Sequence, residues 1–207
     1  MQIQEIPQLM ESTAASLRHS LDLYWPSDVE GRNDLNERNL SLHFAHVLLS
    51  KGFGVFAEAH YPVSFPDGKF LDLLGISPDG DCCVVCEFKK HGKERGMTAS
   101  TWDVERILKF DLHREIAEPR WSKRHVEISS KCRTGIGIVA GLKWTNNSKK
   151  SPRLGDSQKS DFAVKIAGIG GAIGESILVW DQTSFGRLGG YYLQFASFPL
   201  SYSPSQE

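Results

Sequence analysis

Three charged residues stand in two apolar segments where charge is unusual. Asp72 interrupts the run Phe70–Gly75, and Glu87 and Lys89 close the run Cys82–Lys90 as Glu-x-Lys. Strand side chains alternate between two faces, so Glu87 and Lys89 point the same way, and a neighbouring strand can bring Asp72 beside them. Burying such groups is costly unless they are paired. Two carboxylates and one ammonium predict a divalent-cation site, with the lysine beside an activated water or a phosphate.

The strands that carry these residues are predicted from two copies of one turn sequence, Pro-Asp-Gly, at 66–68 and 78–80. Proline presets the first turn angle, aspartate hydrogen-bonds to its own backbone, and glycine accepts a positive φ. Each copy therefore predicts a hairpin connection. The expected strands form an antiparallel meander over residues 53–65, 69–77 and 81–90.

Apolar residues at helical spacing predict helices on both sides of the meander, over residues 4–24, 34–51 and about 101–118. Glu37 stands in the first turn of the second helix, where an acid complements the helix dipole. In the third helix, Trp102, Ile107 and Leu108 are expected to face the core together with Leu112 and Ile116. Its exposed side is expected to carry Arg106, Lys109, His113 and Arg114.

Further elements are predicted after the third helix. A buried strand is expected at 134–142, a short helix at 161–167, and strands near 177–180 and 191–198. Residues 143–160 are polar and basic, which is typical of a mobile loop or of a nucleic-acid contact. The tail from residue 201 is expected to be disordered.

The order helix, three-strand meander, helix, strand, with aspartate on one strand and Glu-x-Lys on the next, resembles the PD-(D/E)xK nuclease superfamily, also called restriction-endonuclease-like. The resemblance covers about residues 33–90 and extends more loosely to residue 142. It implies an α/β fold with a mixed central sheet and an αβββαβ core flanked by helices. We expect one nuclease-like domain over 1–200, made of a helical extension (1–30), the core (33–142), a basic loop (143–160), and an added helix and strands (161–200), followed by the tail (201–207).

The resemblance also implies an activity, the Mg²⁺-dependent hydrolysis of phosphodiester bonds in a nucleic acid, with DNA as the expected substrate and Mn²⁺ as a substitute ion. Asp72 and Glu87 would hold the ion, joined by the backbone carbonyl of Phe88. Glu37 either serves its helix dipole or joins the site through a water. Lys89 would orient or deprotonate the attacking water, or neutralise charge on the phosphate.

Charge is distributed unevenly along the chain. Residues 1–88 hold 5 basic and 13 acidic residues, whereas residues 89–133 hold 12 basic and 7 acidic residues. A nucleic acid could lie along the basic segment while its scissile phosphate reaches the metal, although a solvated surface of mixed charge would have the same composition. The expected nucleic-acid contacts are Lys90, Lys93, Arg106, Lys109 and Arg114.

The main alternative is a catalytically inactive nuclease-like module that binds nucleic acid or a protein partner in a phage, defence or toxin system. The presence of all three signature residues favours catalysis. No separate recognition domain is visible, so site-specific cutting would require insertions or a homodimer. The sequence does not distinguish DNA from RNA, an endonuclease from an exonuclease, or one metal from two.

Composition and termini bound the class of protein. The chain has 207 residues, of which 40% are hydrophobic and 24% charged, as in soluble globular domains. No apolar run approaches the roughly 20 residues that cross a membrane, so no membrane partner is expected. The start, Met1–Glu5, lacks the basic and apolar regions of a signal peptide, which predicts a cytoplasmic protein.

The cysteines and one of the tryptophans are expected to have structural roles. Cys83 and Cys86 lie three apart in one strand, which sends them to opposite faces, so they cannot share a zinc ion and are expected to be buried thiols. Trp102, Trp121 and Trp144 could stack on bases. For Trp102 we expect core packing.

Overall fold

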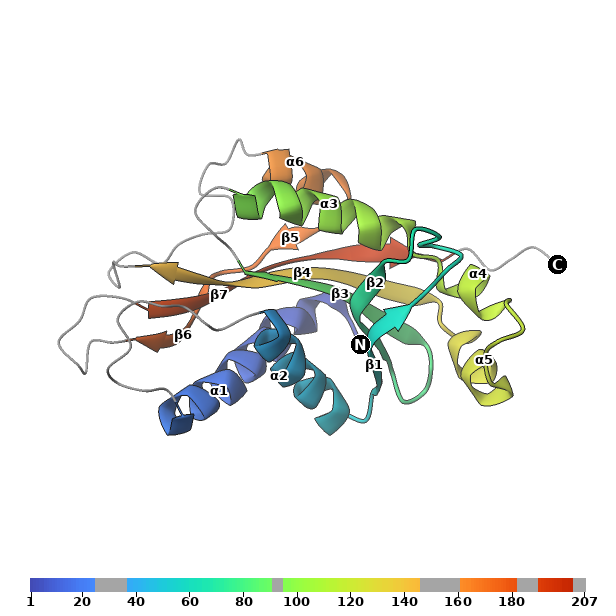
Figure 1. The fold of residues 1–207 in the computed structure, drawn as a ribbon, viewed down its shortest axis with the longest axis horizontal. Helices are drawn as coiled ribbons and strands as arrows, with labels where there is room; N and C mark the ends of the chain where they lie inside the picture. The colour runs from blue at the N-terminus through green and yellow to red at the C-terminus, as the bar shows by residue number, and fades with distance from the viewer. Residues whose placement is uncertain (25–36, 91–94, 146–160, 182–189, 203–207) are drawn as a thin grey trace.

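The computed structural model describes residues 1–24, 37–90, 95–145, 161–181 and 190–202. This part of the chain forms a mixed α/β fold built on one seven-stranded sheet (Figure 1). The strand order is β1-β2-β3-β4-β7, with β5 and β6 both paired to β7. The strands are β1 (Gly54–His60), β2 (Phe70–Ile76), β3 (Cys82–Lys90), β4 (Thr134–Thr145), β5 (Ala172–Ile173), β6 (Ile177–Asp181) and β7 (Gly190–Ser201).

Helices cover both faces of the sheet (Figure 1). One face carries α1 and α2, the opposite face carries α3 and α6, and α4 and α5 lie at one end. The bounds are α1 (Ile6–Tyr24, after the short 3₁₀ turn Ile3–Glu5), α2 (Glu37–Ser50), α3 (Arg95–Lys109), α4 (Leu112–Ile116), α5 (Lys123–Ser129) and α6 (Asp161–Gly168). None of the helices described is both long and apolar enough to cross a membrane.

The predicted antiparallel meander is confirmed. β1 pairs with β2 and β2 with β3, both antiparallel. The turn glycines Gly68 and Gly80 have φ of 79° and 78°, the left-handed conformation that glycine adopts without steric cost. The first strand is shorter than predicted, because the chain turns after His60 and the Phe65 N–H donates to the Tyr61 carbonyl at 2.8 Å.

Strand alternation in β3 decides which face receives the charged residues. Cys82, Val84, Cys86 and Phe88 pack in the core beneath α1 and α2. Cys83 and Val85 pack in the core on the α3 side. Cys83 and Cys86 are both buried free thiols, as predicted. Glu87 and Lys89 continue the second set and therefore face α3.

The predicted third helix is wrong in its bounds and in its buried face. It forms two helices, α3 and α4, separated where Asp111 caps α4 by accepting the Arg114 N–H at 3.2 Å. α3 begins at Arg95, six residues before the predicted start at about residue 101. Trp102 is 66% exposed and Leu108 is 43% exposed, whereas Asp103 is buried. The core-packing prediction for Trp102 is therefore wrong, and α5 was not predicted at all.

Most of the later elements agree with the prediction, but β5 was not predicted. β4 is parallel to β3, with Glu87 beside Val139, and extends three residues past the expected end at residue 142. β6, β7 and α6 occupy the predicted segments. The tail prediction is wrong at its start, because Ser201 pairs with Thr134 and the Cys83 thiol donates to the Tyr202 hydroxyl at 3.4 Å. Most of the predicted basic loop, residues 146–160, and the tail 203–207 lie outside the described residues.

Candidate active site

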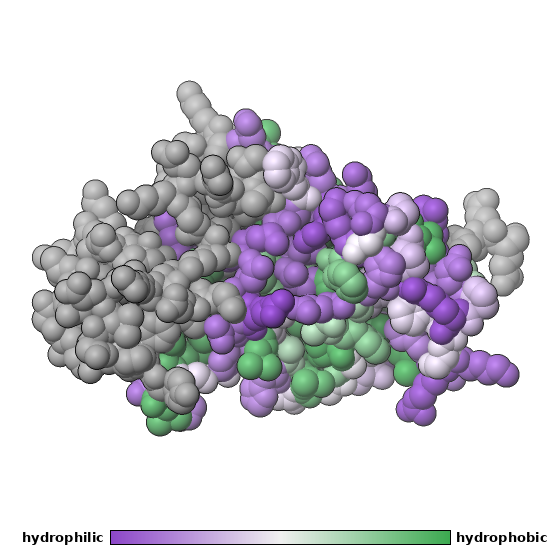
Figure 2. All heavy atoms as spheres, in the orientation of Figure 1, coloured by the Kyte–Doolittle hydropathy of each residue, from purple (hydrophilic) through white to green (hydrophobic). Residues whose placement is uncertain are grey.

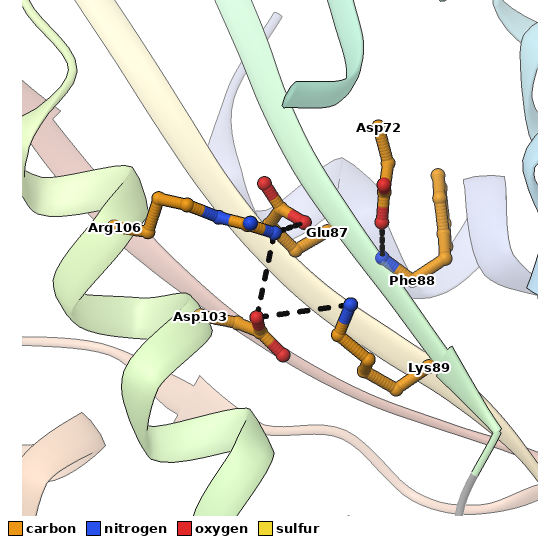
Figure 3. A network of polar contacts seen from close by, with 6 residues as sticks. All are labelled: Asp72, Glu87, Phe88, Lys89, Asp103 and Arg106. Atoms are coloured by element: carbon orange, nitrogen blue, oxygen red, sulfur yellow. Dashed lines mark hydrogen bonds and ion pairs between the residues drawn. The ribbon is translucent and has the colours of Figure 1, made fainter. Parts of the chain in front are cut away.

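Glu87 and Lys89 project from β3 toward α3, as their spacing predicts (Figure 3). Glu87 is completely buried, with 0% of its surface exposed. Lys89 keeps about a quarter of its side chain exposed, and its Nζ lies 3.9 Å from Asp103 Oδ1. The ammonium is thus held at the edge of the site, where it can meet both solvent and a bound anion.

Asp72 lies where β2 and β3 separate. The register of the two strands ends at the pair Leu73–Cys86. One residue further, the Asp72 Oδ2 atom accepts the Phe88 N–H at 2.6 Å (Figure 3), in place of a backbone carbonyl of β2. The Asp72 carboxylate is therefore held by the backbone of β3, at the residue that directly follows Glu87.

The neighbouring strand β1 is distorted at the same level. Glu58 has φ 48°, a conformation that is rare for residues other than glycine, and the β1–β2 register passes over Glu58 and Asp72. Leu71 and Leu73, two residues apart, consequently belong to cores on opposite faces of the sheet. Backbone outliers of this kind concentrate at functional sites.

The helix α3 supplies two side chains whose place in the site the sequence did not predict. The Arg106 guanidinium donates to Glu87 Oε2, and its Nη2 lies 3.5 Å from Asp103 Oδ1 (Figure 3). Arg106 was predicted to be an exposed nucleic-acid contact, but only 21% of its side chain is exposed. Asp103 lies four residues before the buried Ile107 and seven before the buried Phe110, a helical spacing that could have identified it as buried.

Burial and like charge govern protonation in the site. Burial, with the Asp72 charge second, raises the pKa of Glu87 to about 9, and Arg106 only partly opposes this. Burial likewise raises the pKa of Asp103 to about 6, against the lowering influence of Lys89 and Arg106. At neutral pH Glu87 is therefore protonated, while Asp103 is mostly ionised.

Several buried atoms of the site have no hydrogen-bond partner. They are Glu87 Oε1, Asp103 Oδ2 and Arg106 Nε. Buried polar atoms are nearly always paired, so these three atoms call for partners that the described side chains do not supply. Within the described residues, no group of three His, Cys, Asp or Glu side chains is arranged to hold a metal. The Asp72–Glu87 pair nevertheless suits Mg²⁺, which binds one or two carboxylates and keeps several waters.

Glu37 lies on the other side of Asp72. It is the first residue of α2 and lines a small cavity of about 90 Å³. The exposed Arg38 beside it pairs with Glu58 at 3.5 Å. The cavity is lined by Glu37, Arg38, Ser41, Glu58, Asp72 and Phe88. Glu37 and Asp72 thus line the same cavity, whereas Glu87 lies beside Asp72 on the α3 side.

The other predicted nucleic-acid contacts are only partly described. Lys109 and Arg114 are exposed at the end of α3 and on α4. The side chain of Lys90 and all of Lys93 lie outside the described residues. Figure 2 shows hydrophilic side chains over α3 and more hydrophobic ones lower, over α2, where Leu42 and Leu49 are exposed.

Comparisons of the chain with protein-family models, with curated proteins and with solved structures find no match. The chemistry of the site is therefore the ground on which a function can be proposed.

Proposed function

We propose that the protein is a metal-dependent nuclease of the PD-(D/E)xK type, which hydrolyses phosphodiester bonds in a nucleic acid, with DNA as the first substrate to test. The observation that carries the proposal is Glu87, a fully buried carboxyl group beside Asp72 with one oxygen that has no partner. Two adjacent carboxyl groups in a buried place need a proton or a cation between them. A divalent cation satisfies both groups and supplies hydrolytic chemistry.

The arrangement of elements supports the same proposal. The order α2-β1-β2-β3-α3-α4-α5-β4 contains the αβββαβ order expected of a restriction-endonuclease-like core, with two short helices, α4 and α5, added before β4. The acids lie where β2 and β3 part, and Lys89 follows two residues after Glu87 on the same face. A surface ion pair would not require this combination of strand separation, burial and spacing.

Each residue has a role in the proposed reaction. Asp72 and Glu87 would hold the ion, and Glu37 would reach it through a water in the small cavity. Bound Mg²⁺ or Mn²⁺ would lower the pKa of a coordinated water and offset negative charge on the phosphate. Lys89, oriented by Asp103, would donate to a phosphate oxygen or hold the attacking water.

The role of Arg106 would depend on whether a metal ion is bound. Without a metal its guanidinium donates to Glu87 Oε2 and partly opposes the rise in the pKa of Glu87. A cation bound by Asp72 and Glu87 would repel the guanidinium, which could then donate to a phosphate oxygen from the same side of the site. Arg106 would thus serve the nucleic acid from inside the site, in place of the surface contact that the sequence predicted.

Two observations favour a second function, that of an inactive module that binds nucleic acid or a protein. Arg106 already occupies Glu87 Oε2, and the described acids are not gathered into a ready three-ligand site. In such a module the Arg106–Glu87 pair would be purely structural, and no metal would be needed. Melting temperature and cleavage distinguish the two functions.

The first test measures the melting temperature with EDTA, MgCl₂ or MnCl₂. Metal at ten times its Kd should stabilise the wild type by about 1.4 kcal/mol, which is roughly 3 to 6 °C for a chain of this size. Asp72→Asn should lose most of this response, because it keeps an acceptor for the Phe88 N–H but removes the charge. The control Glu127→Gln, an exposed acid on α5, should respond like the wild type.

The second test measures cleavage of linear, circular, branched and single-stranded substrates under the same conditions. Cleavage should require metal and should be lost in Asp72→Asn and Lys89→Ala but not in Glu127→Gln. A wild type that neither cleaves any substrate nor gains stability from either ion would support the inactive module instead. Cleavage at the wild-type rate by Lys89→Ala would overturn the role assigned to that residue.

A further inference from the structure

An exposed indole stands next to the proposed active site. Trp102 is 66% exposed, although the next two residues of α3, Asp103 and Val104, are buried. A tryptophan offers a large flat apolar surface, and leaving it in water forgoes the free energy that its burial would release. Its position beside Asp103 places this surface at the border of the site and not on a remote part of the molecule.

A cavity of about 510 Å³ opens in front of this indole. That volume lies in the range of small-molecule sites, about 300–1,000 Å³. One wall is the loop that connects β1 to β2, and the other is α3. The lining residues are Ser64, Phe65, Pro66, Asp67, Lys69, Trp102, Asp103, Glu105, Arg106 and Lys109.

The loop wall is held in place by buried contacts. Glu115 is completely buried and accepts the Ser64 N–H at 2.5 Å. The Asp111 N–H donates to the Ser64 hydroxyl at 3.2 Å. The Phe65 ring stacks on Phe110 with 13° between the planes. The cavity is therefore preformed, which lowers the entropic cost of binding.

The cavity is continuous with the proposed active site. Asp103 and Arg106 line the cavity and also contact Lys89 and Glu87 (Figure 3). If one part of a ligand is bound in the cavity, the part of the ligand next to it lies beside the residues that would hold the scissile phosphate. For a polymer substrate, this occupant is the nucleotide adjacent to the cleaved bond.

The charges of the lining favour a ligand that combines an aromatic face with an anionic group. Lys69 pairs with Asp67 and Lys165 pairs with Glu105, each at 2.5 Å, so these lining acids are compensated. Lys109 has no ion-pair partner among the residues that the structure describes. Its ammonium is available at the cavity wall for a phosphate next to the stacked group.

We propose that this cavity binds the base of an unpaired nucleotide, stacked on Trp102, so that the protein prefers single-stranded or locally unpaired nucleic acid. In a duplex both faces of a base are covered by its neighbours, whereas an unpaired base can present a face to an aromatic side chain. This inference rests on the proposed function, because it places the base beside the bond to be cleaved.

The test measures binding by fluorescence anisotropy in EDTA, so that no cleavage is needed. The probes are fluorescein-labelled oligothymidylate, oligouridylate and a DNA duplex of the same length. Trp102→Ala should weaken single-strand binding between about fivefold and a hundredfold, which corresponds to the loss of one base–aromatic stack. Trp102→Phe should restore most of the affinity, and duplex binding should change little.

A control variant separates stacking from general disturbance of α3. Leu108→Ala removes another exposed apolar side chain of the same helix, 43% exposed and outside the cavity lining, and should bind like the wild type. Oligothymidylate should also quench tryptophan fluorescence in the wild type, and Trp102→Phe should lose that part of the quenching.

The outcomes distinguish this inference from the proposed function. If single strands bind but Trp102→Ala leaves their affinity unchanged, the inference is wrong and the nuclease proposal stands. A duplex that binds more tightly than the single strands, with an equal loss in Trp102→Ala, also contradicts it. If no nucleic acid binds or is cleaved under any condition, the nuclease proposal itself fails.

Discussion

Glu87 is buried, lies next to a second carboxyl group, and has a pKa raised to about 9 by burial and by Asp72. The folded protein without metal therefore holds a proton that the unfolded chain releases near its ordinary value of 4.5. Because of this group, the free energy of unfolding falls as the pH rises from 4.5 toward about 9. The proposed metal would replace the proton, so binding of Mg²⁺ should release a proton.

This leads to a prediction for the variant Glu87→Gln. In EDTA the unfolding free energy of the wild type should fall between pH 4.5 and about 9, relative to the variant, by at most about 1.4 kcal/mol per pH unit for one proton. Urea denaturation across this range measures the difference, and subtraction cancels groups that both proteins share, such as Asp103. Parallel curves for the two proteins would show that Glu87 does not hold a shifted proton.

Among the residues, Asp72, Glu87 and Lys89 could be predicted, and the two side chains that α3 brings to them could not. Asp72, Glu87 and Lys89 were identified because charge in an apolar strand is conspicuous. Arg106 looked like any basic residue of an exposed helix side, because a helix pattern does not show which arginine reaches a buried acid. Asp103 was missed because acids are expected on the outer face of a helix.

At the scale of elements, turn chemistry and strand alternation carried most of the correct predictions. The two Pro-Asp-Gly turns defined the meander, and the positive φ of Gly68 and Gly80 is the reason. Helix α3 was placed wrongly because its buried face contains Asp103. Because an acid occupies the buried face, the spacing of apolar residues in the sequence indicates a different face, which includes Trp102 and Leu108, and both of these are exposed. The strain at Glu58 has no sequence signal, because it depends on the pairing of β1 with β2.

The packing of α3 on the sheet depends on a glycine in β4. A Cβ atom added at Gly137 would lie 2.3 Å from the Phe198 ring and 2.9 Å from the Ile107 side chain of α3. Gly137→Ala should therefore displace α3 and destabilise the protein by about 1–3 kcal/mol, the usual cost of overpacking. Urea denaturation measures this cost. The control Gly54→Ala, in β1, meets only one atom at 4.0 Å and should cost little, so equal losses would contradict the prediction.

At the scale of the whole molecule, the uneven charge predicts how binding depends on salt. The acids of the proposed site belong to the acidic segment 1–88, and α3 and α4 belong to the basic segment 89–133. A nucleic acid bound along the basic segment would release counterions. Affinity should therefore fall steeply as salt is raised.

The measurement is anisotropy in EDTA over a series of salt concentrations. Lys109→Gln should reduce the log–log slope by about one, because one phosphate contact is lost. Lys51→Gln, in the turn after α2 and outside the basic segment, should leave the slope unchanged. An affinity that is indifferent to salt would favour a protein partner over a nucleic acid.

The position of β7 in the chain has a consequence during translation. β7 pairs with β4 over the whole of Thr134–Thr145, yet the ribosome makes Gly190–Ser201 after every residue of the proposed site. Until then β4 is an edge strand, and an apolar edge is a template for pairing with other chains. The nascent chain thus carries Glu87 and Lys89 on an unfinished sheet. Ribosome-bound chains stalled before Gly190 should be cut by protease within β4, and chains stalled after β7 has emerged should resist.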